Sequence, residues 1–143
     1  MDKNLTVTAT IDINADTIQV WDALINPEKI KVYLFGTETI SEWKVGSPII
    51  FQGEFQGIKY QDKGTIKDIK PHKLLQYDYW SGFSGLEDKP ENYSLVTYKL
   101  ESANNKTTLI LTQTGFANDQ AHQHSLNAWT QVLEKIKELT EKV

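Results

Sequence analysis

Acid–base chemistry is the first possibility that the sequence raises, through two carboxylates that stand in segments of alternating polar and apolar residues. Glu54 and Asp62 both lie in such segments, which are typical of strands with one buried face. Burial disfavours the charged form of a carboxylate and raises its pKa toward the range useful for proton transfer. The sequence does not decide which way either side chain points. A cyclase or hydratase that uses one of them as a base, with a tyrosine stabilising an oxyanion, therefore stays open as an alternative function.

Metal and cofactor chemistry finds little support in the residue pattern. His122 and His124 are two positions apart in a predicted helix and so point to different faces, and His72 follows a proline in a turn. There is no cysteine, and we find no phosphate-binding loop, zinc-peptidase motif or serine-hydrolase motif. The acidic residues of the segment 81–91 are expected to be solvated, as in most loops. We predict neither a metal nor a cofactor.

Binding of a small apolar molecule is better supported, because aromatic and apolar side chains recur with strand periodicity. If alternation holds, Leu75, Tyr77 and Tyr79 share one face of a strand. The next two strands and the C-terminal helix add further apolar groups and one amide. Such a lining desolvates a flat or aliphatic ligand and meets its polar atoms with phenol or amide groups. The predicted ligand-binding residues are Tyr33, Tyr77, Tyr79, Val96, Tyr98, Leu111, Gln113, Leu126 and Trp129.

The alternative interpretation of these aromatic residues is that they simply fill a hydrophobic core. We expect the binding cavity to lie near the first half of the C-terminal helix, with Tyr33 and the loop 81–91 at its entrance. The small residues Gly53, Gly64 and Ala128 are expected to widen this cavity rather than fill it.

The first quarter of the chain predicts one strand and two short helices. Apolar residues alternate from 5 to 13, as in a strand with one buried face. Asn14 and Asp16 are followed by an apolar helical stripe, which predicts a helix over 16–25. Asn26-Pro27 then restarts the chain, because asparagine caps helices and proline suits their first turn. A second short helix is expected to carry Ile30, Tyr33 and Leu34.

The rest of the chain predicts five more strands and one long helix. Asp119 is a candidate cap for a helix of roughly 23 residues, about 35 Å long, that runs to the C-terminus with a continuous apolar face. A long loop at 81–91 separates the third and fourth of these strands. The strands are expected near residues 47–55, 58–69, 73–80, 92–101 and 106–114.

This order of elements predicts an α+β fold. Six strands form a curved antiparallel sheet, and the long helix covers one of its faces. With 143 residues, no repeat and no linker, the chain is expected to form one domain over 1–143.

The charge and hydropathy of the chain limit the classes of partner and the cellular locations that we expect. Lys and Arg number 15 against 19 Asp and Glu, and no basic stripe is present, so nucleic acid is not expected as a partner. No apolar run is long enough for a membrane span, and the N-terminus lacks the apolar block of a signal peptide. A cytoplasmic location is the default expectation.

Several short motifs, in this order and at these spacings, resemble the START-like (SRPBCC, polyketide-cyclase) superfamily. This is the superfamily of the helix-grip fold, and the closer resemblance is to its activator of Hsp90 ATPase homologue 1-like (AHSA1) branch. The resemblance spans nearly the whole chain. It is carried by VWDAL at 20–24 and NPE at 26–28, Trp43 with Gly46, GTI at 64–66 leading to Pro71, LQYDY at 75–79, VTYKL at 96–100, and LILTQTGF at 109–116 before Trp129.

The resemblance implies a helix-grip fold with a cavity between sheet and helix, but not one activity, since fold does not fix function. Many relatives carry a histidine near the position of Gln113, and this chain does not. It also has one expected domain, without the N-terminal domain of the eukaryotic chaperone activator. We therefore predict a binding protein for a small hydrophobic or aromatic ligand. The alternatives are a chaperone-interacting domain and the enzyme described above.

Overall fold

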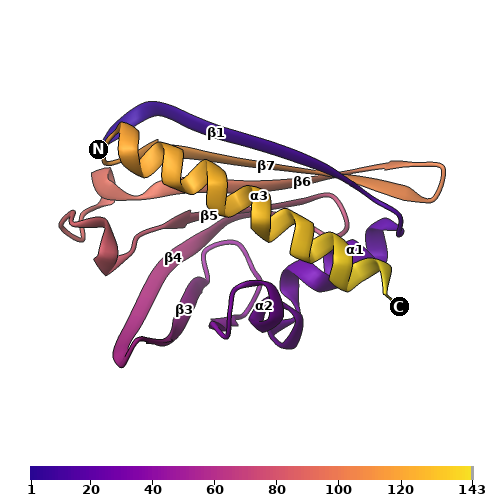
Figure 1. Cartoon of the computed structure of the whole chain (residues 1–143), viewed down its shortest axis with the longest axis horizontal. Helices are drawn as coiled ribbons and strands as arrows, with labels where there is room; N and C mark the ends of the chain where they lie inside the picture. Colours follow the sequence, from indigo (N-terminus) through magenta and orange to yellow (C-terminus); the bar gives the residue numbers. More distant parts are fainter. Residues whose placement is uncertain (143) are drawn as a thin grey trace.

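A seven-stranded antiparallel sheet and a long C-terminal helix dominate the computed structural model, which describes residues 1–142 (Figure 1). The strands lie side by side in the order β1-β7-β6-β5-β4-β3-β2, and the segment between β5 and β6 contains two short 3-10 turns. The predicted α+β helix-grip arrangement is confirmed. The elements are β1 (Asp2–Ile13), α1 (Thr17–Ile25), α2 (Pro27–Tyr33), β2 (Glu38–Ser41), β3 (Pro48–Phe55), β4 (Ile58–Lys70), β5 (Leu74–Tyr79), β6 (Ser94–Ala103), β7 (Lys106–Phe116) and α3 (Asp119–Glu141).

The helices begin where side chains can accept their free backbone N–H groups. Asp16 accepts the N–H of Gln19 at 2.9 Å and starts α1, and Asn26 accepts the N–H of Glu28 at 3.1 Å and starts α2. The cap of α3 is Asn118 rather than the predicted Asp119. Both residue types can cap, and Asp119 instead lies in the first turn, where its charge suits the helix dipole.

The strand count of six was wrong by one, because β2 was not predicted. This strand has only four residues and pairs antiparallel with β3, from Glu38 opposite Gln52 to Ser41 opposite Ile49. Only Thr39 within it is buried, so it has too little alternation to give a signal. Its position at the sheet edge extends the concave face beyond β3.

The long helix covers only part of the concave face of this sheet. It crosses the sheet obliquely and packs mainly against β1, with smaller contacts to β7, α1 and α2 (Figure 1). Its buried residues, Val132, Leu133, Ile136 and Thr140, all lie in its C-terminal half. The core is therefore concentrated where α1, α2 and the C-terminal half of α3 meet the sheet.

The sheet bends sharply between β4 and β5. Their pairing shifts between Ile66 and Asp68, and Lys63 bridges to Trp80 beyond the end of β5. At Gly64 the two backbones come so close that a Cβ atom would stand 1.7 Å from the carbonyl oxygen of Asp78. Only a residue without a side chain fits there.

Candidate functional site

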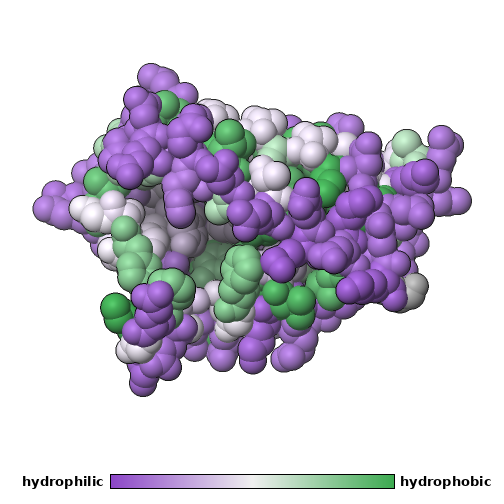
Figure 2. Space-filling view, viewed as in Figure 1, coloured by the Kyte–Doolittle hydropathy of each residue, from purple (hydrophilic) through white to green (hydrophobic). Residues whose placement is uncertain are grey.

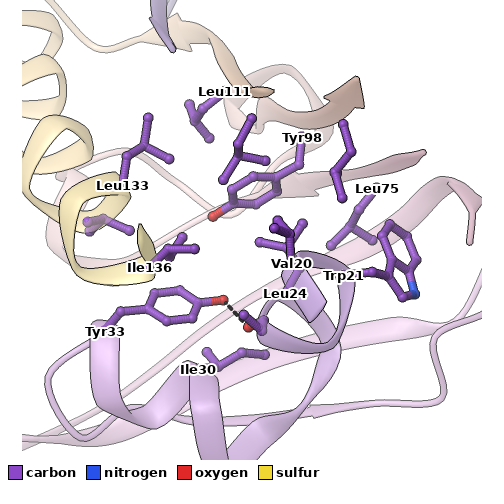
Figure 3. Close-up of a cluster of buried hydrophobic side chains, with 14 of the residues drawn as sticks. Val20, Trp21, Leu24, Ile30, Tyr33, Leu75, Tyr98, Leu111, Leu133 and Ile136 are labelled. Atoms are coloured by element: carbon purple, nitrogen blue, oxygen red, sulfur yellow. Dashed lines mark hydrogen bonds between the residues drawn. The ribbon is translucent and has the colours of Figure 1, made fainter. Parts of the chain in front are cut away.

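One end of the space between helix and sheet is filled by the protein's own side chains. Tyr33, Leu75 and Tyr98 are buried there among residues of α1 and α3, as Figure 3 shows. The space left between them measures only about 10 Å³, close to the smallest space that holds one water molecule. It is lined by Leu24, Ile30, Tyr33, Leu34, Trp43, Ile49, Phe51, Leu75, Tyr77 and Tyr98. This closed end lies at the C-terminal half of α3, whereas the cavity was expected near the first half of that helix.

Tyr33 in particular is not an entrance residue, contrary to the expectation. It is only 2% exposed, and its hydroxyl donates a hydrogen bond to the carbonyl of Ala23 at 2.9 Å, which ties α2 to α1. Burial and the nearby phenol of Tyr77 raise its pKa well above the usual value. Tyr33 therefore belongs to the core at the closed end.

The other end of the grip is open. Figure 2 shows a hollow in the molecular surface, which in the view of Figure 1 lies between the N-terminal half of α3 and strands β4 and β5. Tyr79 of β5 and Leu126 and Trp129 of α3 are half-buried. Trp129 reaches the closed end, because its ring meets Tyr98 edge-on at 5.9 Å between centroids. The predicted ligand-binding residues thus fall into two groups, one packed in the core and one at the hollow.

Val96 and Leu111 belong to the first group. Both are essentially unexposed, at 1% and 0%, on the concave faces of β6 and β7. Tyr77 and Tyr98 lie on the same faces and are also buried, and burial raises the pKa of each phenol. These four residues contribute packing, whereas Tyr79, Leu126 and Trp129 are half-buried on the elements that border the hollow.

Asp62 is the polar residue of the concave face that the sequence left undecided, and it points inward. It is 8% exposed, and its Oδ2 accepts a hydrogen bond from the Tyr79 hydroxyl at 2.6 Å. Burial first, and then the negative charge of Asp62 and this hydrogen bond, raise the pKa of Tyr79 well above its usual value. Phe51 packs against Tyr79 with ring centroids 5.8 Å apart. The carboxylate therefore sits among aromatic rings.

Glu54, the second candidate carboxylate, is exposed on the opposite face of the sheet. Adjacent strand residues point to opposite faces, and Glu54 lies an odd number of positions from the inward-facing Phe51. Its partner in the register is Lys59. Only Asp62 of the two could take part in chemistry on the concave face.

Gln113 holds the helix to the sheet rather than offering a free amide. Its Oε1 accepts hydrogen bonds from Trp129 Nε1 at 2.6 Å and from Ser125 Oγ at 3.1 Å, and its Nε2 donates to Ser94 Oγ at 3.0 Å. The residue is buried. One side chain thus links α3, β7 and β6 at the margin of the open end.

Replacing Gln113→Leu is expected to destabilise the protein by about 1–3 kcal/mol, because buried donors of Trp129 and Ser125 lose their acceptor. Chemical denaturation followed by far-ultraviolet circular dichroism measures the change. Gln131→Leu, at an exposed position of α3, is the matched control and should change stability by no more than about 0.5 kcal/mol. Equal stability of both variants would contradict the role given to Gln113.

The small residues do not widen the cavity as expected. The Tyr60 ring covers Gly53, with its hydroxyl oxygen 2.7 Å from where a Cβ would stand, and Gly64 accommodates the backbone of β5. Ala128 is exposed on the outer side of α3. In each case the reason is local packing, which the sequence pattern does not reveal.

An apolar rim at the tip of the β3–β4 hairpin was missed. Phe55, Ile58 and Phe83 are each about 60% exposed, and Phe83 packs against Tyr60 with ring centroids 6.0 Å apart. Phe55 pairs with Ile58 in the register, on the same face as Phe51 and Asp62. Strand alternation could have identified this rim, because it places both residues on the concave face.

The loop 81–91 lies beside this rim and is tied down by polar contacts. Trp80 Nε1 donates to the carbonyl of Leu86 at 3.1 Å, and Asp88 accepts from the Tyr93 hydroxyl at 2.5 Å and pairs with Lys63 at 2.5 Å. Hydrogen bonds from Lys63 and Tyr93 lower the pKa of Asp88. Asp88 thus holds the loop to Lys63 of β4 and to Tyr93.

The histidines are dispersed. The ring of His122 bonds through Nε2 to the carbonyl oxygen of Thr6 at 2.8 Å and packs edge-on against Phe116, His124 is exposed, and His72 lies against Trp21. Within residues 1–142, no three side chains of metal-ligating type gather into a possible site.

A separate open depression of about 650 Å³ lies beside β2, β3 and β4. Its lining includes Lys31, Glu38 and Gln61.

Comparison with known proteins identifies the relatives of this chain. Residues 14–141 match the family model described as activator of Hsp90 ATPase homolog 1-like protein. The search of curated proteins gave no match. Among the described residues, no helix has the length and hydrophobicity to cross a membrane.

Solved structures resemble the chain over almost its full length. The solution structure of ChR145 from Cytophaga hutchinsonii is 39% identical, with a TM-score of 0.85, over 99% of this chain and 97% of that one. Protein MLL2253 from Mesorhizobium loti is 23% identical, with a TM-score of 0.79 over 96% and 98% of the two chains. The Aha1 dimer from Colwellia psychrerythraea is 18% identical, with a TM-score of 0.74 over 95% and 96%. The last two likenesses show the fold alone.

Proposed function

The chain belongs to the activator of Hsp90 ATPase homolog 1-like family, and from this premise we propose that it binds a small, largely aromatic or aliphatic molecule in the hollow at the open end of the grip. The observation that carries the proposal is the contrast between the two ends of the space between sheet and helix. One end is filled to a residual 10 Å³, whereas at the other a surface hollow lies between the N-terminal half of α3 and strands β4 and β5. These elements carry the half-buried residues Tyr79, Leu126 and Trp129.

The apolar rim supports the proposal from outside the hollow. Three large apolar residues are exposed at the hairpin tip and in the neighbouring loop: Phe55, Ile58 and Phe83. Exposed groups of this kind often mark binding sites. A ligand that rests against Tyr79 and Trp129 would cover part of this surface. Burial of about 250 Å² of apolar area contributes about 6 kcal/mol, from which the cost of association is subtracted, so weak binding is expected for a simple ring compound.

The two alternative functions remain predictions with less support. For the enzyme, Asp62 does point inward, but the Tyr79 hydroxyl donates to Asp62 and is therefore occupied rather than directed at a substrate oxyanion. For the chaperone-interacting domain, the argument is the family description, and no contact among the described residues favours that partner.

The proposal can be tested by titrating ¹⁵N-labelled protein with the neutral apolar probe N-phenyl-1-naphthylamine and following the indole N–H signals by NMR. We expect the Trp129 signal to shift, because Trp129 is half-buried and belongs to the N-terminal half of α3, which borders the hollow. The signal of Trp21, which is buried against His72 at the closed end, should stay in place and serves as the internal control. No shift up to the solubility limit, or shifts confined to Trp21, would overturn the proposal.

A further inference from the structure

The carboxylate of Asp62 is incompletely paired. Its Oδ2 accepts the Tyr79 hydroxyl, but its Oδ1 is buried without any hydrogen-bond partner. No ion pair of the described residues includes Asp62. A buried carboxyl oxygen without a partner is costly, and most such atoms in proteins are satisfied by a donor. The unpaired oxygen therefore points to a missing donor.

The neighbouring residues define what kind of donor would fit. Asp62 lies opposite Phe51 in the β3–β4 register, and Phe51 packs against both Tyr77 and Tyr79. Aromatic faces attract cations, and they add to the attraction of a carboxylate. The nearest lysine in the chain, Lys63, points to the other face and pairs with Asp88. At this point the protein thus supplies a carboxyl group and aromatic rings, and within residues 1–142 no cationic side chain pairs with that carboxyl group.

We propose that Asp62 Oδ1 anchors a positively charged nitrogen of the ligand, so that the hollow accepts aromatic amines in preference to alcohols or acids of the same shape. This inference rests on the proposed function and adds the chemical class of the ligand. The aromatic body of the ligand would lie in the hollow against Tyr79, whose hydroxyl contacts Asp62. Because Oδ1 is shielded from solvent, neighbouring side chains would move apart to let the ammonium group donate to it. An acidic ligand is disfavoured because its carboxylate would meet a second buried negative charge.

The test compares three probes that differ in one group: naphthylmethylamine, naphthylmethanol and naphthylacetate. For the wild-type protein, NMR titrations should show the amine binding about tenfold more tightly than the alcohol, a difference of about 1.4 kcal/mol, and the acid binding most weakly. In Asp62→Asn the three affinities should become equal within about a factor of two. The control Glu54→Gln removes a carboxylate from the opposite face and should keep the tenfold preference.

Each outcome separates this inference from the proposed function. If the wild type binds all three probes equally, Asp62 Oδ1 holds an ordered water only, and the inference fails while ligand binding in the hollow stands. A preference for the amine that survives in a folded Asp62→Asn variant also overturns it. If none of the probes binds, both proposals fail. The wild-type comparison needs no variant, so it decides the matter even if Asp62→Asn does not fold.

Discussion

Gly64→Ala is expected to destabilise the protein by about 4 kcal/mol or more, the range reached only by severe structural conflicts. The added Cβ would stand 1.7 Å from the carbonyl oxygen of Asp78 and 2.7 Å from its carbonyl carbon. Both atoms belong to backbone, so no side chain can move aside to relieve the clash. Strands β4 and β5 would have to separate, and the hydrogen bond from the Thr65 N–H to Asp78 Oδ1, at 2.7 Å, would be lost with them.

Urea unfolding followed by circular dichroism measures this loss, and Gly82→Ala is the matched control. A Cβ at Gly82 meets nothing closer than the Trp80 ring at 4.0 Å, and the backbone there has no left-handed φ. The control should change stability by no more than about 0.5 kcal/mol. A Gly64→Ala protein as stable as its control would show that the two strands do not approach as closely as described.

Alkaline pH is expected to unfold the protein cooperatively as the buried phenols are forced to ionise. Burial is the main cause that raises the pKa of Tyr33, Tyr77, Tyr79 and Tyr98 above the usual value of 10.0. In the unfolded chain these phenols ionise near pH 10, whereas in the folded protein they stay protonated. Their contribution to stability is therefore complete below pH 10 and is lost as the pH rises toward their folded pKa values.

The expected size of this effect is large. Each phenol that ionises only in the unfolded chain lowers the free energy of unfolding by about 1.4 kcal/mol per pH unit above pH 10, so the four together remove about 5.5 kcal/mol per pH unit. Tyrosinate absorbance should rise in a step that coincides with the loss of circular dichroism, and Tyr33→Phe should make that step smaller. Gradual ionisation of all phenols near pH 10 in a folded protein would contradict the burial of these rings.

The strands and helices were largely predictable because period and caps are local properties of the sequence. The alternation in β1, β5, β6 and β7, and the stripe of α3, each determine a buried face without knowledge of the rest of the chain. Strand β2 was not predictable on this basis, since four residues with one buried side chain carry too short a pattern. Its formation depends on pairing with β3, which is a tertiary effect.

The candidate site was predictable only in part, because the sequence pattern gives the face of a strand but not the part of that face that α3 covers. Alternation correctly grouped Tyr77, Tyr79 and Tyr98 on one face, but it cannot tell which part of that face the helix will cover. Burial of Tyr33 and exposure of the rim residues follow from the oblique path of α3. The inward direction of Asp62 follows from its register with Phe51, which requires the β3–β4 pairing to be known.

The pairing of β1 with β7 has a consequence for the order in which the protein can fold during synthesis. Thr6 lies opposite Thr114 and Ile13 opposite Thr107, and the Thr107 hydroxyl donates to the carbonyl of Ala15. The first strand to leave the ribosome therefore has no neighbouring strand until the last strand, β7, has been synthesised. Closing so long a loop is entropically costly and slow, so a nascent chain that stalls before β7 would expose an unpaired strand to other chains.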